Sequence, residues 1–182
     1  MTDAQNHSAA ERLRQSVERH ATRELADCVA CGVPLFPAAT DAEKAAWVGH
    51  ACGELERRFA PDTIRAIRKA CHCREEGRLD EMKSWLGALY RESSSLAEFV
   101  EKVNAHGAGW YIEDGALYTK FLNCECYMLQ GVASLESMTW CLCAEGYTED
   151  LFRHVFGREV ESELLQTIKT GHEFCLIAIR IT

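Results

Sequence analysis

The stretch that decides the fold is residues 107–122, GAGWYIEDGALYTKFL, because the spacing of apolar side chains changes there. Before Gly107, apolar residues recur every three or four positions, which predicts helices. After it they alternate with polar residues, and Asp114-Gly115 lies between two alternating runs. This dipeptide is a strong signal for a two-residue hairpin turn. The stretch therefore marks the passage from helices to an antiparallel sheet.

Capping signals and apolar stripes predict a series of helices upstream of Gly107. Ser8 with Glu11, and Ser95 with Glu98, fit the capping-box pattern at the start of a helix. Helices are expected over residues 8–25, 41–59, 61–71, 79–89 and 95–107. A break containing Gly32, Pro34 and Pro37 follows the first of them.

Downstream of Gly107, alternation predicts strands near residues 110–113, 116–122, 137–143, 158–168 and 175–181, with a short helix between Thr148 and Gly157. The expected fold class is α+β, with N-terminal helices packed on a C-terminal antiparallel sheet of about five strands and one inserted helix. Two regions are expected. Residues 1–40 would form an N-terminal helix with a cysteine-bearing connector, and residues 41–182 a helical and antiparallel-sheet domain that binds a ligand and a metal.

Charge and cysteine content bound the function. Acidic residues outnumber basic ones by 28 to 20, which opposes binding to nucleic acid because phosphates need a basic surplus. No signal peptide or membrane-spanning segment is predicted, so a cytoplasmic location is expected. In a reducing compartment, the ten cysteines favour metal binding or redox chemistry over structural disulfides.

Two C-x-C doublets, Cys124 with Cys126 and Cys141 with Cys143, carry the most information. On a strand, residues i and i+2 point to the same face, so two strand ends could bring four thiols together. Four thiolates suit Zn²⁺ or, alternatively, an iron–sulfur cluster. Extended i and i+2 positions are about 6.5–7 Å apart, so binding one ion requires a bend or fewer ligands. Some of the four could instead be buried as small apolar residues.

A second candidate metal site lies among cysteines of the helical half, which are expected at the ends of three helices and comprise Cys28, Cys31, Cys52, Cys71 and Cys73. Structural or reactive thiols are the alternative. Cys175 alternates with isoleucines and is expected in the core, or as a fifth wall of the doublet site. Three aromatic residues could border an apolar ligand pocket, with core packing as the alternative: Trp110, Tyr118 and Trp140.

The C-terminal motifs permit a family comparison. From Ala116 the chain continues as ALYTKFLNCECYM and later as MTWCLCAEGYTEDLFRHVFGREVESELLQTIKTGHEFCLIAIRI. Over about residues 50–182 it resembles the 4-vinyl-reductase-type small-molecule-binding domain, and most closely cysteine-rich, uncharacterised bacterial relatives of L-2-amino-thiazoline-4-carboxylic acid hydrolases. The resemblance implies helices on an antiparallel sheet, an enclosed pocket for hydrophobic ligands, and zinc held by cysteines near the sheet at the positions of the doublets.

These observations leave two main classes of function. The first is a cysteine-rich metal-binding protein with a pocket for a small apolar or sulfur-containing ligand, acting as a sensor or binding module. The alternative is a metal- or cysteine-dependent hydrolase of a thiazoline-like substrate, and a third option is an iron–sulfur redox protein. No catalytic base stands out by spacing, so the binding module is favoured and enzymatic activity is left open. The expected partner is a small molecule, with no nucleic acid and no membrane; a homodimer is left open.

Overall fold

The computed structural model describes residues 3–36, 38–72 and 76–182. The chain forms two compact units that alternate along the sequence. Unit 1 comprises Met1–Cys73 and Cys124–Cys143, and unit 2 comprises Arg74–Asn123 and Ala144–Thr182. The boundary predicted at residue 40 falls inside unit 1. Each place where the chain passes between the units lies beside a cysteine of the C-x-C or Cys-His-Cys motifs.

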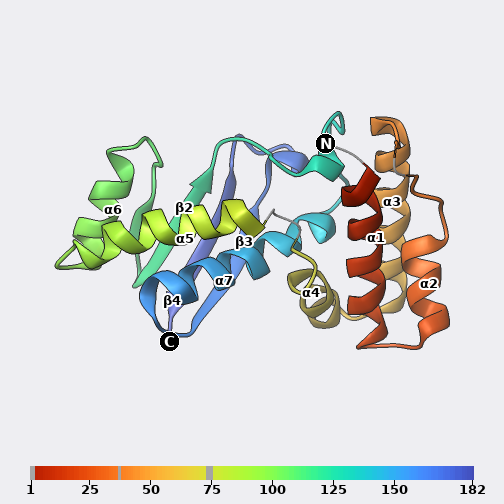
Figure 1. Ribbon diagram of the computed structural model, residues 1–182, viewed down its shortest axis with the longest axis horizontal. Helices are drawn as coiled ribbons and strands as arrows, with labels where there is room; N and C mark the ends of the chain where they lie inside the picture. Colours follow the sequence, from red (N-terminus) through yellow and green to blue (C-terminus); the bar gives the residue numbers. More distant parts are fainter. Residues whose placement is uncertain (1–2, 37, 73–75) are drawn as a thin grey trace. The chain divides into compact units, whose positions relative to one another are not determined.

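Unit 1 is helical. It contains α1 (Asp3–Glu18), α2 (Arg23–Cys31), α3 (Asp41–Arg58), α4 (Pro61–Lys69) and the 3₁₀ turns η1 (Tyr127–Leu129) and η2 (Thr139–Leu142). Helices α1, α2 and α3 run alongside one another (Figure 1), and α4 packs against α1 and α3. The turn η1 contacts α3, and η2 contacts both α3 and α4. These two turns carry the segment that contains the doublets into the helical unit.

The single helix predicted over residues 8–25 is wrong, because the structure has two helices there. The helix α1 begins at Asp3, before the predicted Ser8 cap, and ends at Glu18. Thr22 then caps α2, and its side chain accepts a hydrogen bond from Leu25 N at 3.4 Å. A threonine hydroxyl at this position satisfies a backbone donor that would otherwise lack a partner, which favours a new helix start.

Unit 2 packs helices on a sheet. It contains α5 (Glu76–Arg91), α6 (Leu96–Asn104), β1 (Tyr111–Glu113), β2 (Ala116–Phe121), β3 (Val160–Gln166), η3 (Ile168–Thr170) and β4 (Cys175–Ile181), together with α7 (Cys143–Phe156), whose first residue belongs to unit 1. The strands pair antiparallel in the order β1-β2-β4-β3. The α+β class is confirmed, and the described residues form four strands rather than about five.

The predicted hairpin at Asp114-Gly115 is confirmed. Both residues adopt positive φ angles, 48° for Asp114 and 76° for Gly115, and Glu113 pairs with Ala116 across the turn. Two consecutive positive φ angles are what a tight hairpin needs to match the twist of its strands. The Ser95 cap is confirmed as well, since its hydroxyl accepts from Glu98 N at the start of α6.

The strand predicted over residues 137–143 is wrong. Thr139–Leu142 forms η2, and α7 starts at Cys143, five residues before the predicted cap at Thr148. Alternation of Met138, Trp140 and Leu142 suggested a strand, but Trp140 is the only fully buried one of the three. A short tight turn can bury one large side chain without any partner strand, and the alternation does not distinguish the two cases.

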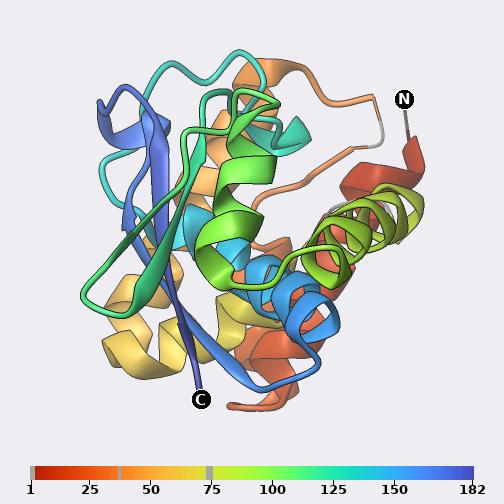
Figure 2. The same cartoon turned by 90° about the vertical axis from the view of Figure 1, so that its left-hand side faces the viewer.

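Helices of unit 2 lie on one face of the sheet. Figures 1 and 2 show α5, α6 and α7 on the same side of β2, β3 and β4. The burial pattern agrees, because Leu117 and Thr119 of β2, and Ile177 and Ile179 of β4, are buried on the same face. Among the described residues, no helix is long and apolar enough to cross a membrane.

Two buried glutamates of α7 bind the backbone of β3. Glu145 Oε1 accepts a hydrogen bond from Leu164 N at 2.8 Å, and Glu149 Oε1 accepts one from Ser162 N at 3.1 Å. The Ser162 hydroxyl donates to Glu145 O at 3.0 Å. Buried carboxylates need such donors, because an unsatisfied buried charge is strongly unfavourable.

Replacing Glu145 with leucine is expected to destabilise unit 2 by about 1–3 kcal/mol, because Leu164 N would lose its acceptor inside the protein. Glu145→Gln is the matched control, since its amide oxygen can still accept the bond. Unfolding in urea, followed by far-UV circular dichroism, measures both. Equal stability of the two variants would contradict the assigned role of the carboxylate.

Candidate functional site

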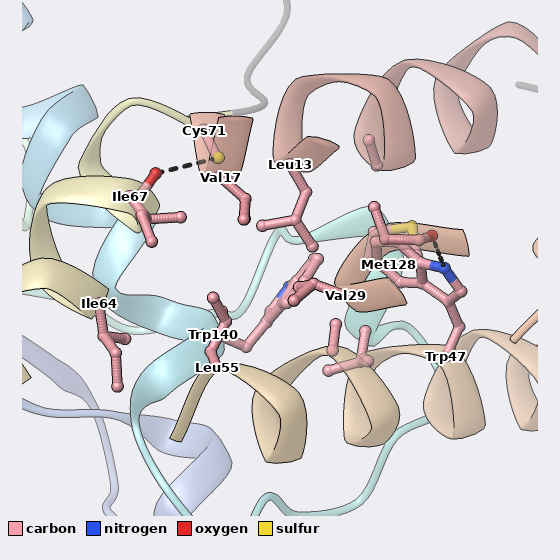
Figure 3. Packing of buried hydrophobic residues seen from close by; sticks show 14 of the residues in the cluster. Leu13, Val17, Val29, Trp47, Leu55, Ile64, Ile67, Cys71, Met128 and Trp140 are labelled. Atoms are coloured by element: carbon pink, nitrogen blue, oxygen red, sulfur yellow. Dashed lines mark hydrogen bonds between the residues drawn. The ribbon is translucent and has the colours of Figure 1, made fainter. Parts of the chain in front are cut away.

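The buried thiol of Cys71 lies at the end of α4. Its Sγ donates to Ile67 O at 3.1 Å, and the hydroxyl of Ser16 in α1 donates to the same carbonyl at 2.8 Å. Figure 3 shows Cys71 beside the apolar side chains of the unit 1 core, among them Leu13 and Val17 of α1. Contacts with α1 therefore fix the position of Cys71 at the end of α4.

A buried arginine lies one helical turn before Cys71. Arg68 is only 2% exposed, its guanidinium carbon lies 3.9 Å from the centroid of the Trp140 ring, and Nη2 donates to Trp140 O at 2.8 Å. Trp140 in turn meets Trp47 edge to face, with ring centroids 5.4 Å apart (Figure 3). A cation held over an aromatic face is favourable when both are removed from water.

Cys52 lies within electrostatic reach of Arg68 and of Cys143. Burial raises the pKa of Cys52 to about 12; Arg68 opposes this increase in pKa and Cys143 adds to it. Burial likewise raises the pKa of Cys71, with the same opposition from Arg68 and the same addition from Cys143. Thiols from α3 and from the end of α4 therefore lie within electrostatic reach of both the buried Arg68 and Cys143.

The other doublet cysteines pack on the same core. Cys124 and Cys126 precede η1, Cys141 lies within η2, and all three are half-buried against the apolar cluster of unit 1. These three cysteines thus share an apolar core with Cys52 and Cys71, which the sequence placed in a second candidate site, and Cys143 lies within electrostatic reach of the latter two. We call these six residues the thiol cluster: Cys52, Cys71, Cys124, Cys126, Cys141 and Cys143.

The side chains of the thiol cluster are too far apart to coordinate one metal ion as they stand. Within residues 3–36, 38–72 and 76–182, no three cysteine, histidine or carboxylate side chains are close enough to hold one metal ion. No disulfide joins any two of the nine cysteines that the structure describes. Cys73, the remaining member of the second candidate site, lies outside the described residues.

Cys28 and Cys31 lie apart from the thiol cluster. Cys28 Sγ is 3.5 Å from Glu54 Oε2 and 3.7 Å from Arg58 Nη2, and Cys31 is exposed at the end of α2. Glu54 follows Cys52 by two positions in α3, so the two side chains point about 200° apart around the helix. The C-x-x-C pair therefore contacts a different face of α3 from the one that carries Cys52.

Cys175 belongs to unit 2. It begins β4 and accepts a hydrogen bond from Ile168 N at 3.4 Å. The three predicted pocket aromatics are divided between the units. Trp110 packs against Phe152 in unit 2, with ring centroids 5.6 Å apart, and Tyr118 stacks on Tyr111 at 4.7 Å. Trp140 lies in the core of unit 1, so a pocket shared by these three residues stays a prediction.

A cleft opens in unit 1 beside the thiol cluster. Its volume is about 250 Å³, and its walls are Glu56, Pro61, Asp62, Ile64, Arg65, Thr139 and Leu142. Glu56 Oε1 accepts hydrogen bonds from the hydroxyls of Ser137 at 2.5 Å and Thr139 at 2.6 Å. Glu56 lies one turn after Cys52, and Leu142 lies between Cys141 and Cys143. None of these wall residues is a cysteine, but the charge of Glu56 contributes to the raised pKa of Cys52.

Sequence reasoning missed Arg68 and Glu56. Arg68 occupies an i+4 position from Ile64, on the apolar stripe of α4, and precedes Cys71 by three residues. A charged residue on a buried stripe is a usable signal, because full burial of arginine is rare without a partner. Glu56 carries no comparable signal, since its role depends on Thr139, which lies 83 residues away in the sequence.

Comparison with known proteins adds a family but no activity. No curated protein matches the chain. A family model described as a family of unknown function matches residues 4–182, which includes both units and the thiol cluster. The chain therefore belongs to the family of unknown function DUF6144.

Proposed function

We propose that unit 1 is a metal-binding module in which thiolates of the thiol cluster hold the metal beside Arg68. The observation that carries the proposal is the convergence of α3, α4 and the η1–η2 segment on one core, each contributing cysteines. Soft thiolate ligands favour Zn²⁺ or an iron–sulfur cluster over hard cations. Cys52 and Cys71 are the proposed ligands within electrostatic reach of Arg68, and Cys143 is a proposed ligand within electrostatic reach of both thiols.

The positive charge of Arg68 would offset the negative charge of a metal–thiolate group at this site. A metal bound by four thiolates carries a net negative charge, and burying such a charge is unfavourable without compensation. The Arg68 guanidinium is buried, and its position is fixed by the Trp140 ring and carbonyl. It therefore supplies a positive charge where the thiolates would develop theirs.

Metal binding would draw the thiols closer and would be coupled to folding of unit 1. Tetrahedral zinc needs sulfurs at about 2.3 Å from the ion, closer than the described cysteines are gathered. The free energy of binding would then appear as stability of the unit. Zinc is the proposed ion. An iron–sulfur cluster is the alternative, because six cysteines exceed the four that one tetrahedral ion uses.

The cleft at Glu56 is the proposed place for a small ligand. Ile64 and Leu142 give the cleft an apolar part that suits the small apolar or sulfur-containing ligand expected from the sequence, and charged residues, among them Arg65, complete its walls. Glu56 also favours a second candidate function. A carboxylate beside an open metal position can act as a general base for hydrolysis, as a thiazoline hydrolase would need.

Elemental analysis and visible absorption of anaerobically purified protein test the metal proposal. We expect stoichiometric zinc in a colourless protein; a brown protein with broad absorption would indicate an iron–sulfur cluster instead. Cys143→Ser and Cys52→Ser should each lower metal content and melting temperature together. Cys175→Ser in unit 2 and Cys31→Ser on α2 are the controls, and both should retain the metal.

The outcomes separate clearly. Wild-type protein that contains neither zinc nor iron, and that does not bind added zinc under reducing conditions, would end the metal proposal. Full metal content in every variant of the thiol cluster would place the metal elsewhere. For the hydrolase alternative, turnover of a 2-aminothiazoline-4-carboxylate by metal-loaded protein, abolished in Glu56→Gln, is the expected result. If the wild-type protein shows no turnover, the hydrolase alternative is excluded and the metal-binding module remains as the proposed function.

A further inference from the structure

The C-x-x-C pair of α2 is a surface dithiol with polar contacts of its own. Cys31 is the last residue of α2 and is exposed, and Cys28 lies one turn earlier and is half-buried. Arg58 Nη2 reaches Cys28 Sγ at 3.7 Å, and the same sulfur lies 3.5 Å from Glu54 Oε2. A sulfur placed between a charged donor and a charged acceptor is distinct from a cysteine packed as a small apolar side chain.

The carboxylate of Glu54 forms ion pairs with two arginines, Arg57 and Arg58. The Cys28 S–H donates to Glu54, and Arg58 offers a charged donor to the sulfur of a Cys28 thiolate. One contact therefore suits the thiol and the other suits the thiolate.

The last turn of α2 is held by side chains of α3. Trp47 Nε1 donates to Ala30 O at 2.9 Å, and His50 Nε2 lies 2.9 Å from Cys28 O. A Cβ added at Gly32, the residue that follows Cys31, would lie 2.5 Å from Cys28 O and from the His50 ring, so only glycine fits there. Side chains thus satisfy terminal carbonyls that have no partner within the helix.

This helix end can close a disulfide with a small rearrangement. Side chains three residues apart on a helix have Cβ atoms about 5–6 Å apart. A disulfide needs about 3.5–4.5 Å between Cβ atoms. Because Cys31 is the last residue of α2, only the final turn of the helix would have to tighten to bring the two Cβ atoms within this range.

We propose that Cys28 and Cys31 form a redox-active dithiol that exchanges with low-molecular-weight disulfides. The Cys28 thiolate attacks one sulfur of the disulfide R–S–S–R, forming a Cys28–S–S–R bond and releasing RS⁻, which takes up a proton. The Cys31 thiolate then attacks the Cys28 sulfur and releases the second RS⁻. The protein loses two electrons and two protons, and the disulfide is reduced to two thiols.

The order of attack follows from the environments of the two thiols. Partial burial raises the pKa of Cys31, and Asp27 raises it further, so this thiol stays protonated at neutral pH. Arg58 places a guanidinium beside the Cys28 sulfur, where it can stabilise the charge of a thiolate at that sulfur. On this contact we assign Cys28 as the attacking residue and Cys31 as the residue that resolves the mixed disulfide.

Peptide mapping tests this exchange directly. Trypsin cleavage after Arg23 and Lys44 gives the peptide of residues 24–44, whose only cysteines are Cys28 and Cys31. Full-length protein is equilibrated anaerobically with oxidised glutathione, alkylated and digested. We expect this peptide to carry an internal disulfide, with the loss of two hydrogen atoms. Recovery of the peptide with both thiols alkylated would overturn the proposal.

Single variants test the order of attack. In Cys31→Ser, Cys28 should accumulate as a mixed disulfide with glutathione; in Cys28→Ser, Cys31 should react at least several-fold more slowly. Arg58→Gln should slow the reaction of Cys28 several-fold. Arg57→Gln is the matched control, because Arg57 also binds Glu54 but makes no contact with the sulfur. Equal rates for the two cysteines, or for the two arginine variants, would contradict the assigned roles.

The dithiol is independent of the metal proposal. Metal content of Cys28→Ser and Cys31→Ser should equal that of the wild type, and circular dichroism confirms that these variants fold. Loss of metal in both variants would instead make the pair part of the metal centre and would overturn its role as a separate dithiol.

Discussion

Trp47→Ala is expected to lower the free energy of unfolding of unit 1 by about 3–5 kcal/mol, the range for removing a large buried aromatic side chain. Trp47 is fully buried, meets Trp140 edge to face and donates its indole N–H to Ala30 O. Truncation would leave a cavity between α2, α3 and η2 and an acceptor without its donor. Denaturant unfolding followed by circular dichroism measures the loss.

Two matched variants separate the contributions. Trp47→Phe keeps a ring but loses the hydrogen bond to Ala30 O, so it should cost less than Trp47→Ala. Trp85→Ala removes a tryptophan that is 37% exposed in unit 2 and meets His106 edge to face, so it should cost less than Trp47→Ala. A loss below about 1 kcal/mol in Trp47→Ala would show that the core can close around the missing ring.

Alkaline pH is expected to destabilise the reduced, metal-free protein through Cys52. Burial raises the pKa of Cys52 from 9.0 to about 12 in the folded state. Between these values the thiol ionises in the unfolded chain but stays protonated in the folded one. The contribution of Cys52 to the free energy of unfolding is therefore intact below pH 9 and is lost as the pH rises toward 12. The loss is about 1.4 kcal/mol per pH unit, or about 4 kcal/mol over the whole window.

The slope of stability against pH is the measurement. Unfolding by urea at several pH values from 8 to 10.5, with a chelator and a reductant, should give a steeper fall for the wild type than for Cys52→Ala. The variant removes the titrating group while lysines and tyrosines titrate equally in both proteins. Parallel curves would show that the Cys52 thiol is accessible to solvent. Protein loaded with metal should lack this dependence, because a coordinating thiol is already deprotonated.

Local signals made most of the fold predictable. The Asp114-Gly115 turn, the Ser95 cap and Pro61 at the start of α4 act through the backbone of a few neighbouring residues, and all three occur as expected. The segment at 137–143 could not be predicted in this way. Its conformation depends on burying Trp140 against Trp47 and Arg68, which lie about 93 and 72 residues earlier.

The candidate site was predictable in its residue types and not in its grouping. Cysteine spacing within each motif is local, and it led to the prediction of a metal site at the doublets, which stays a prediction. Which motifs meet depends on long-range packing, here of η1 and η2 on α3 and α4. The doublets were assigned to strand ends, so Cys52 and Cys71 were placed in a separate site although they share a core with the doublets. Arg68 links these groups and was not recognised.

The carboxylates of α7 bear on how this protein behaves at high concentration. In the order β1-β2-β4-β3, strand β3 is an outer strand, and an outer strand normally presents free amide donors to which another polypeptide can add. Leu164 N and Ser162 N are already bonded to Glu145 and Glu149. These two donors, in the middle of the seven-residue strand, are therefore not offered to a foreign strand, and the opposite edge, β1, has only three residues to offer.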